Sequence, residues 1–143
     1  MSLEALRKLR AQTEESLTME LAQATHELIR MEQRCDQLNA QMQAEASSYR
    51  VEAEQGLIIE AMLEWQGRLD SHQAALQQTR SAVGHLAEEW SRVRARLIEA
   101  TQERKVLDRF IERQREARRA DVQRREQQAT DEAAGRCFAL RRS

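Results

Sequence analysis

The chain has 143 residues, of which 33% are charged and only 3% aromatic, and it contains four glycines and no proline. So few aromatic residues argue against a compact globular core, whereas abundant Ala, Glu, Gln, Arg and Leu are typical of a coiled coil or long helix. The formal net charge of −1 gives no reason to expect binding to nucleic acid or to an acidic membrane surface.

The first third of the chain predicts an amphipathic helix. Its core-facing positions alternate in steps of four and three residues, and all eight are apolar: Leu17, Leu21, Ala24, Leu28, Met31, Cys35, Leu38 and Met42. This spacing is a heptad repeat, which predicts a coiled-coil helix over about residues 3–47. A looser stripe precedes it, made of Leu3, Leu6, Leu9 and Thr13.

A turn is predicted over about residues 48–57. Beyond Met42 the first stripe reaches Glu45, Tyr49 and Glu52, so it fades. Ser47, Ser48 and Gly56 lower the helix propensity of this stretch. The next repeat starts one residue out of phase, which favours a helical hairpin. One continuous helix with a phase slip, paired in a parallel dimer, is the alternative.

The second repeat predicts a longer helix over about residues 58–135. Of its sixteen core-facing positions from Ile58 to Ile111, thirteen are apolar, and the exceptions are His72, Thr79 and Arg104. Past Ile111 these positions become Gln114, Arg118 and Asp121. A stripe that turns polar has lost its partner helix.

The predicted fold is therefore all-α: a single coiled-coil domain over residues 1–143. Two long helices form an antiparallel coiled-coil hairpin, and the second helix is longer, with a C-terminal overhang. If the turn is centred near residue 52, Leu3 lies opposite about Thr101 and Cys35 opposite about Leu69.

The sequence predicts neither an enzyme nor a cofactor or metal site. His26, His72 and His85 fall on different helix faces without clustered cysteines or carboxylates. Cys35 and Cys137 would lie too far apart along the hairpin for a disulfide. No apolar run approaches the roughly 20 residues that cross a bilayer, and the opening residues MSLEALRKLR have no continuous apolar stretch of secretory length. We therefore expect a cytoplasmic protein that binds other proteins and does not insert into the membrane.

Three segments are candidate binding surfaces. Residues 112–143 carry nine basic and six acidic groups, net +3, and form either a solvated helix or a docking surface for acidic groups. Nucleic acid is a weak third choice because no aromatic residues are interleaved for base stacking. An apolar patch at Val106, Leu107, Phe110 and Ile111 precedes this segment. Apolar residues at the turn either close it or form an exposed tip.

Three features carry a resemblance to a known family. They are the opening LEALRKLRAQTEE (residues 3–15), Tyr49 at the mid-chain break, and residues 103–136. The last segment contains Glu112, Arg113 and Gln114, followed by Asp131, Glu132, Ala134 and Arg136. With the chain length, these features resemble the stalk proteins of type III export systems: the flagellar FliJ protein and its injectisome counterparts, the YscO family. The sequence leaves open whether the system serves a flagellum or virulence.

The resemblance implies a two-helix coiled coil similar to the central stalk of rotary ATPases, located beside the membrane-embedded export apparatus. Its helical ends would bind the hexameric export ATPase ring through Leu3, Leu6, Phe110, Ile111, Arg113, Arg118 and Arg119. Its hairpin tip would meet the export gate, a membrane protein, through Tyr49, Ile58 and Ile59. Some members also handle secretion chaperones. The alternative is a scaffold protein that associates with itself into a homo-oligomer.

Overall fold

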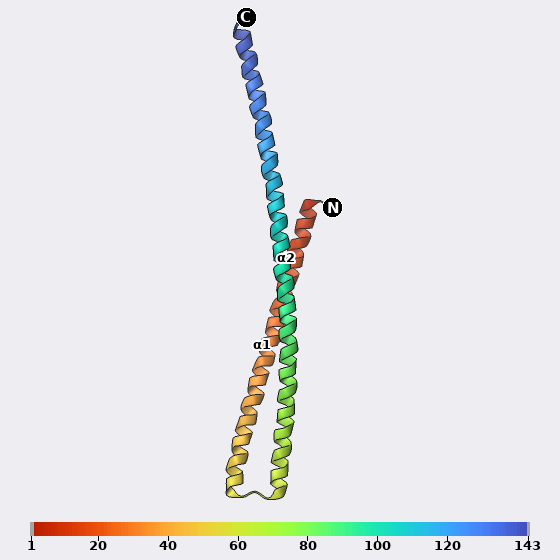
Figure 1. Cartoon of the computed structure of the whole chain (residues 1–143), viewed down its shortest axis with the longest axis vertical. Coiled ribbons are helices and arrows are strands. Elements are labelled where there is room, and N and C mark those ends of the chain that lie inside the picture. Colours follow the sequence, from red (N-terminus) through yellow and green to blue (C-terminus); the bar gives the residue numbers. More distant parts are fainter. Residues whose placement is uncertain (1, 143) are drawn as a thin grey trace. The chain divides into compact units, whose positions relative to one another are not determined.

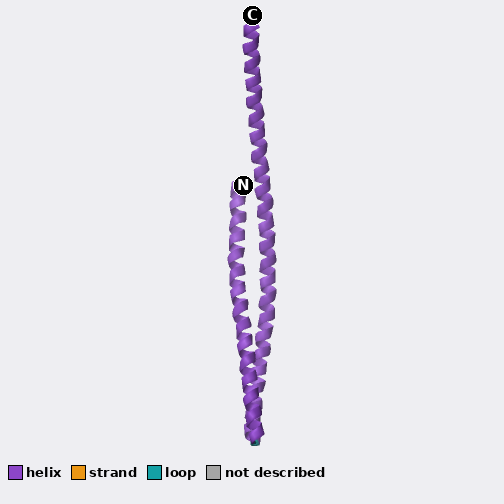
Figure 2. Cartoon of the chain, turned by 90° about the vertical axis from the view of Figure 1, so that its left-hand side faces the viewer, coloured by secondary structure: helices purple, strands orange, loops and turns teal. Residues whose placement is uncertain are grey.

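A computed structural model describes residues 2–142 and contains two helices, α1 (Leu3–Gln55) and α2 (Ile59–Arg142). No strand occurs among these residues. Figure 2 shows the helices in purple and one short loop joining them. α2 has 84 residues and α1 has 53, and the contacts between them are antiparallel. The predicted all-α antiparallel pair with a longer second helix is confirmed.

The ends of α1 follow from local chemistry. Ser2 caps the helix, because its hydroxyl oxygen accepts a hydrogen bond from the Ala5 backbone N–H at 3.1 Å. At the other end Gly56 has φ of +97° and its N–H donates to the Ala53 carbonyl at 3.2 Å. A glycine in this left-handed conformation ends a helix at little steric cost.

The helix bounds differ from those predicted. α1 ends at Gln55 rather than near residue 47, the loop comprises only residues 56–58, and α2 reaches Arg142 rather than about 135. The cause lies at Glu45, Tyr49 and Glu52, where the apolar stripe fades. These polar or amphipathic side chains have contacts on α2, so α1 remains paired through this region.

The chain divides into two compact units, and each is described by itself. We call residues 14–98 the turn unit, and residues 2–13 with 99–142 the terminal unit. In the turn unit α1 and α2 run side by side in opposite directions, drawn in orange to yellow and in green in Figure 1.

The core of the turn unit follows the two predicted heptad stripes. Its buried side chains are Leu38 of α1 and Trp65, Leu76 and Val93 of α2, of which Val93 is the most completely covered. All eight predicted positions of the first stripe are buried or half-buried. Among the second stripe's positions in this unit, only Ile58 and Met62, beside the loop, are exposed. The heptad spacing therefore identified the packed faces correctly.

Polar pairs fix the register of the turn unit. Trp65 Nε1 donates to Glu52 at 3.0 Å, and Trp90 Nε1 donates to Thr25 Oγ1 at 2.8 Å. In an antiparallel pair, two residues at the same level have residue numbers with a nearly constant sum. This sum is 117 and 115 for the two hydrogen-bonded pairs, so Cys35 lies level with residues 80–82. The prediction that placed Cys35 opposite Leu69 was wrong, because the loop lies farther along the chain than residue 52.

In the terminal unit the first turns of α1 pack on α2. Glu4 pairs with Arg115 at 3.3 Å and Arg7 with Asp108 at 3.3 Å, so the start of α1 lies beside residues 111–118 rather than Thr101. Ala100 and Ile111 of α2 are buried in this unit, and Ile111 lies beside the start of α1. Residues 115–142 are exposed except half-buried Asp121, as the predicted overhang requires.

Candidate partner-binding surfaces

The terminal unit contains an open groove, which we call the terminal groove. Its lining residues come from both helices: Leu6, Arg10, Glu99, Gln102, Glu103, Val106, Leu107 and Phe110. Val106 is 65% exposed and Phe110 49% exposed, whereas Leu6 and Leu107 are half-buried. Two well-exposed apolar side chains therefore lie beside an apolar floor, a composition that marks contact sites for other proteins.

A second, smaller hollow lies at the start of α1. It is lined by Ser2, Leu3 and Glu4 of α1 and by Ile111, Gln114, Arg115 and Arg118 of α2. Ile111 is only 7% exposed, so its side chain packs between the helices and is not part of the outer surface. Leu3 lies at the margin and is 37% exposed.

Charged pairs replace apolar contacts in this part of the helix pair. Arg7 pairs with Asp108 and Arg10 with Glu103. The predicted stripe through Leu9 and Thr13 was wrong, because both residues are exposed. Continuing the heptad backward from Leu17 leads to Glu14, Arg10 and Arg7. Because these residues are charged, the spacing of apolar residues does not identify this contact face.

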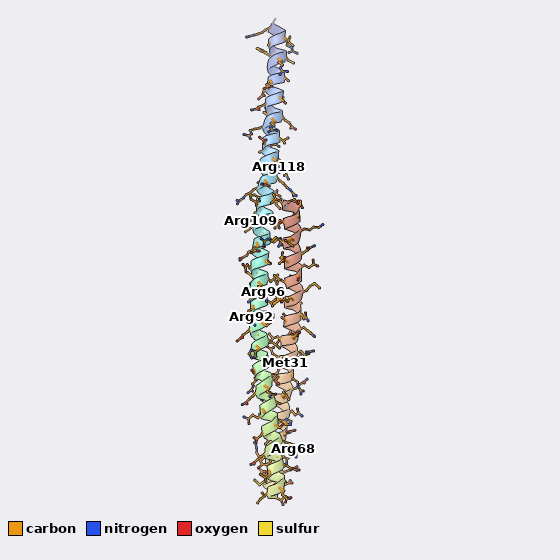
Figure 3. The ribbon with its side chains drawn as sticks, turned by 90° about the vertical axis from the view of Figure 1, so that its right-hand side faces the viewer. Met31, Arg68, Arg92, Arg96, Arg109 and Arg118 are labelled. Carbon is orange, nitrogen blue, oxygen red and sulfur yellow. The ribbon has the colours of Figure 1, made fainter. Side chains whose placement is uncertain are left out.

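The arginine-rich segment of α2 presents cations at two levels. Arg113, Arg118 and Arg119 are exposed, and no ion pair to them occurs in the described part of the chain. Figure 3 shows Arg109 and Arg118 on α2 near the level at which α1 begins. Farther along, Asp121 pairs with Arg124 at 2.9 Å and Arg125 at 3.3 Å. Exposed guanidinium groups near α1 can therefore bind carboxylates of a partner.

The loop end of the turn unit forms a second apolar surface, which we call the turn tip. Ile58 is 69% and Ile59 75% exposed, and Val51 and Leu63 are also exposed. Tyr49 is half-buried against Trp65, with ring centroids 5.9 Å apart in an edge-on arrangement. Arg68 lies over the Trp65 ring at 4.4 Å. The aromatic pair closes the helix ends, while the isoleucines face solvent.

These surfaces are suited to protein contacts. Within residues 2–142, no group of three or more His, Cys, Asp or Glu side chains has the arrangement to hold a metal ion. No helix in this range is long and apolar enough to cross a membrane.

The fold and its surfaces define a two-helix coiled coil with an exposed apolar surface in each unit. The sequence model of the flagellar FliJ protein family matches residues 1–143, so the chain belongs to the FliJ family. Comparisons with curated proteins and with solved structures found no match. Membership of this family makes the chain a component of the flagellar protein export apparatus, in a family of non-enzymatic export proteins.

Proposed function

We propose that the chain is the central stalk of the export apparatus and links the hexameric export ATPase to the export gate. The stalk would work in the cytoplasm beside the membrane-embedded machinery, and it would also handle secretion chaperones. It would contact the ATPase subunits unequally and so favour closure of some subunits over others. It would not catalyse a reaction itself. Family membership and the two separate exposed surfaces support this proposal.

The ATPase contact is assigned to the terminal unit. The observation that carries this assignment is the exposed Phe110 at the terminal groove, close in sequence to the exposed arginines 113, 118 and 119. Aromatic and arginine side chains dominate the energetics of protein interfaces. Leu3 and Leu6 would add apolar area, and Ile111 would act through its packing, because it is buried between the helices.

The test of the ATPase contact uses two exposed apolar residues, one on each helix. Adding the chain to its cognate ATPase should raise the hydrolysis rate. Phe110→Ala should raise the concentration of the chain needed for this effect about tenfold, which corresponds to about 1.4 kcal/mol of binding free energy. Met19→Ala, at a side chain 69% exposed on α1 in the turn unit, is the control and should leave the effect unchanged. Equal stimulation by both variants would contradict the assignment.

The gate contact is assigned to the turn tip. Ile58 and Ile59 would bind an apolar surface of the gate, and Tyr49 would support them through its contact with Trp65. Replacing both isoleucines by serine should abolish binding to the gate's cytoplasmic domain in a pull-down and leave ATPase stimulation intact. Ile29→Ser, at a 47% exposed position on α1, is the control. Undiminished gate binding by the double variant would rule out this contact.

A further inference from the structure

One face of α2 in the terminal unit is left without a partner helix. Its members are Val106 and the residues three, four and seven positions before and after it, and all are exposed: Glu99, Gln102, Glu103, Val106, Arg109, Phe110 and Arg113. At about 100° per residue these positions share one side of the helix, centred on Val106. α1 covers a different side, on which Ala100 and Ile111 are buried. We call the exposed face the 99–113 stripe.

The charges of this stripe are sorted along the helix. Both acids, Glu99 and Glu103, lie before Val106, and both arginines, Arg109 and Arg113, lie after it. Glu103 pairs with Arg10 of α1, but Glu99, Arg109 and Arg113 have no ion pair within residues 2–142. The stripe is therefore acidic at one end, apolar in the middle and basic at the other end.

We propose that the 99–113 stripe binds the same stripe of a second copy of this chain, antiparallel and around a two-fold axis at Val106. In that register the residue numbers of facing positions sum to 212, twice 106. Glu99 of each copy then faces Arg113 of the other, because both positions lie within about 20° of Val106 around the helix. The two-fold axis repeats this pair, which gives two ion pairs, one on each side of Val106.

Charge order selects this arrangement. A parallel pairing in register would place Glu99 against Glu99 and Arg113 against Arg113, and like charges at facing positions are destabilising. In the antiparallel register Glu99 meets the opposite charge of Arg113 instead.

The contact is small, so the dimer is weak and reversible. About four helical turns per copy bury less area than the 1,200–2,000 Å² of stable complexes. The contact also covers Phe110 and Arg113, which we assign to the ATPase surface. One copy therefore cannot use this face for both partners at the same time. The dimer inference does not depend on the ATPase proposal, because dimer formation is measured on the chain alone, without the ATPase.

The first test measures solution mass against concentration by sedimentation equilibrium, from about 1 to about 300 μM protein. The natural chain should pass from monomer to dimer within this range. Glu99→Arg should raise the concentration of the monomer–dimer transition at least tenfold, because the new arginine of each copy would face Arg113 of the other. Adding Arg113→Glu in the same chain should restore it, since the facing charges are again opposite. Glu112→Arg, outside the stripe, is the control and should leave the transition unchanged.

A second test locates the two-fold axis. In a background with Cys35→Ser and Cys137→Ser, Val106→Cys should form an intermolecular disulfide under mild oxidation. Val122→Cys, at another exposed valine of α2, should not.

A chain that remains monomeric throughout the concentration range would overturn the inference. So would a dimer that is insensitive to Glu99→Arg, or failure of Val106→Cys to cross-link.

Discussion

At the residue scale, the helix pair depends on a few well-covered apolar side chains separated by polar pairs. Leu76 is 2% and Val93 1% exposed, whereas most other core-facing residues are only half-buried. The Trp90–Thr25 and Trp65–Glu52 hydrogen bonds join the two helices. A slip of register would leave these donors without their partners, and each such loss costs about 1–3 kcal/mol. Apolar burial supplies the stability, and the polar pairs select the register.

Leu76→Ala tests how much one covered side chain contributes. Removing a leucine side chain from a filled site should lower the free energy of unfolding by about 2–5 kcal/mol. Urea denaturation followed by circular dichroism measures the change. Leu63→Ala, at a residue 62% exposed, should change it by less than about 0.5 kcal/mol. Equal losses in the two variants would show that the packed face has been assigned incorrectly.

At the scale of the element, the loop is determined by one glycine. α1 continues until Gly56, whose φ of +97° allows the chain to leave the helix. The serines at positions 47 and 48 do not end α1, and Ser48 donates its hydroxyl hydrogen to the Ala44 carbonyl at 3.1 Å. Helix propensity alone therefore predicted too early an end, because tertiary contacts at Glu45, Tyr49 and Glu52 outweigh it.

Gly56→Ala separates backbone conformation from packing. A Cβ added at Gly56 would meet nothing within 4 Å, so any effect arises from the positive φ. This variant should lose about 1 kcal/mol of unfolding free energy. Gly67→Ala, also with open space but within α2, should gain about 0.5–1 kcal/mol. Thermal melting of the two variants should therefore shift in opposite directions, and a shift in the same direction would contradict this account of the turn.

The sequence allowed the helices and most of their packed faces to be predicted, but not their alignment. Heptad spacing identified Leu38, Leu76 and Val93 because burial follows the apolar period. The register depended on where the loop lies, and apolar periodicity gives no signal where Glu45 meets His72 at 3.4 Å or Arg7 meets Asp108. The same limitation applied to the patch at residues 106–111. Its exposed and buried members could be separated only once α1 had been aligned.

At the scale of the whole molecule, the proposed function assigns partner binding to outer surfaces rather than to a pocket. A coiled coil has little interior, so its binding residues must lie on outer faces or beyond the end of the partner helix. The turn tip and the terminal groove belong to different units. Variants at one surface should therefore leave binding at the other unchanged.

Every surface assignment depends on the return of α2 along α1 within one molecule, and an electron–electron distance measures this directly. Spin labels would replace Glu20 and Arg96, whose charged atoms lie 4.0 Å apart, in a chain lacking Cys35 and Cys137 and diluted with unlabelled protein. The antiparallel pair predicts a short distance, set by helix axes about 8–10 Å apart and by the label tethers. One continuous helix would separate these positions by about 114 Å at 1.5 Å per residue. Loss of the short distance when labelled chains are diluted with unlabelled protein would show that the distance lies between two molecules, and would contradict the account.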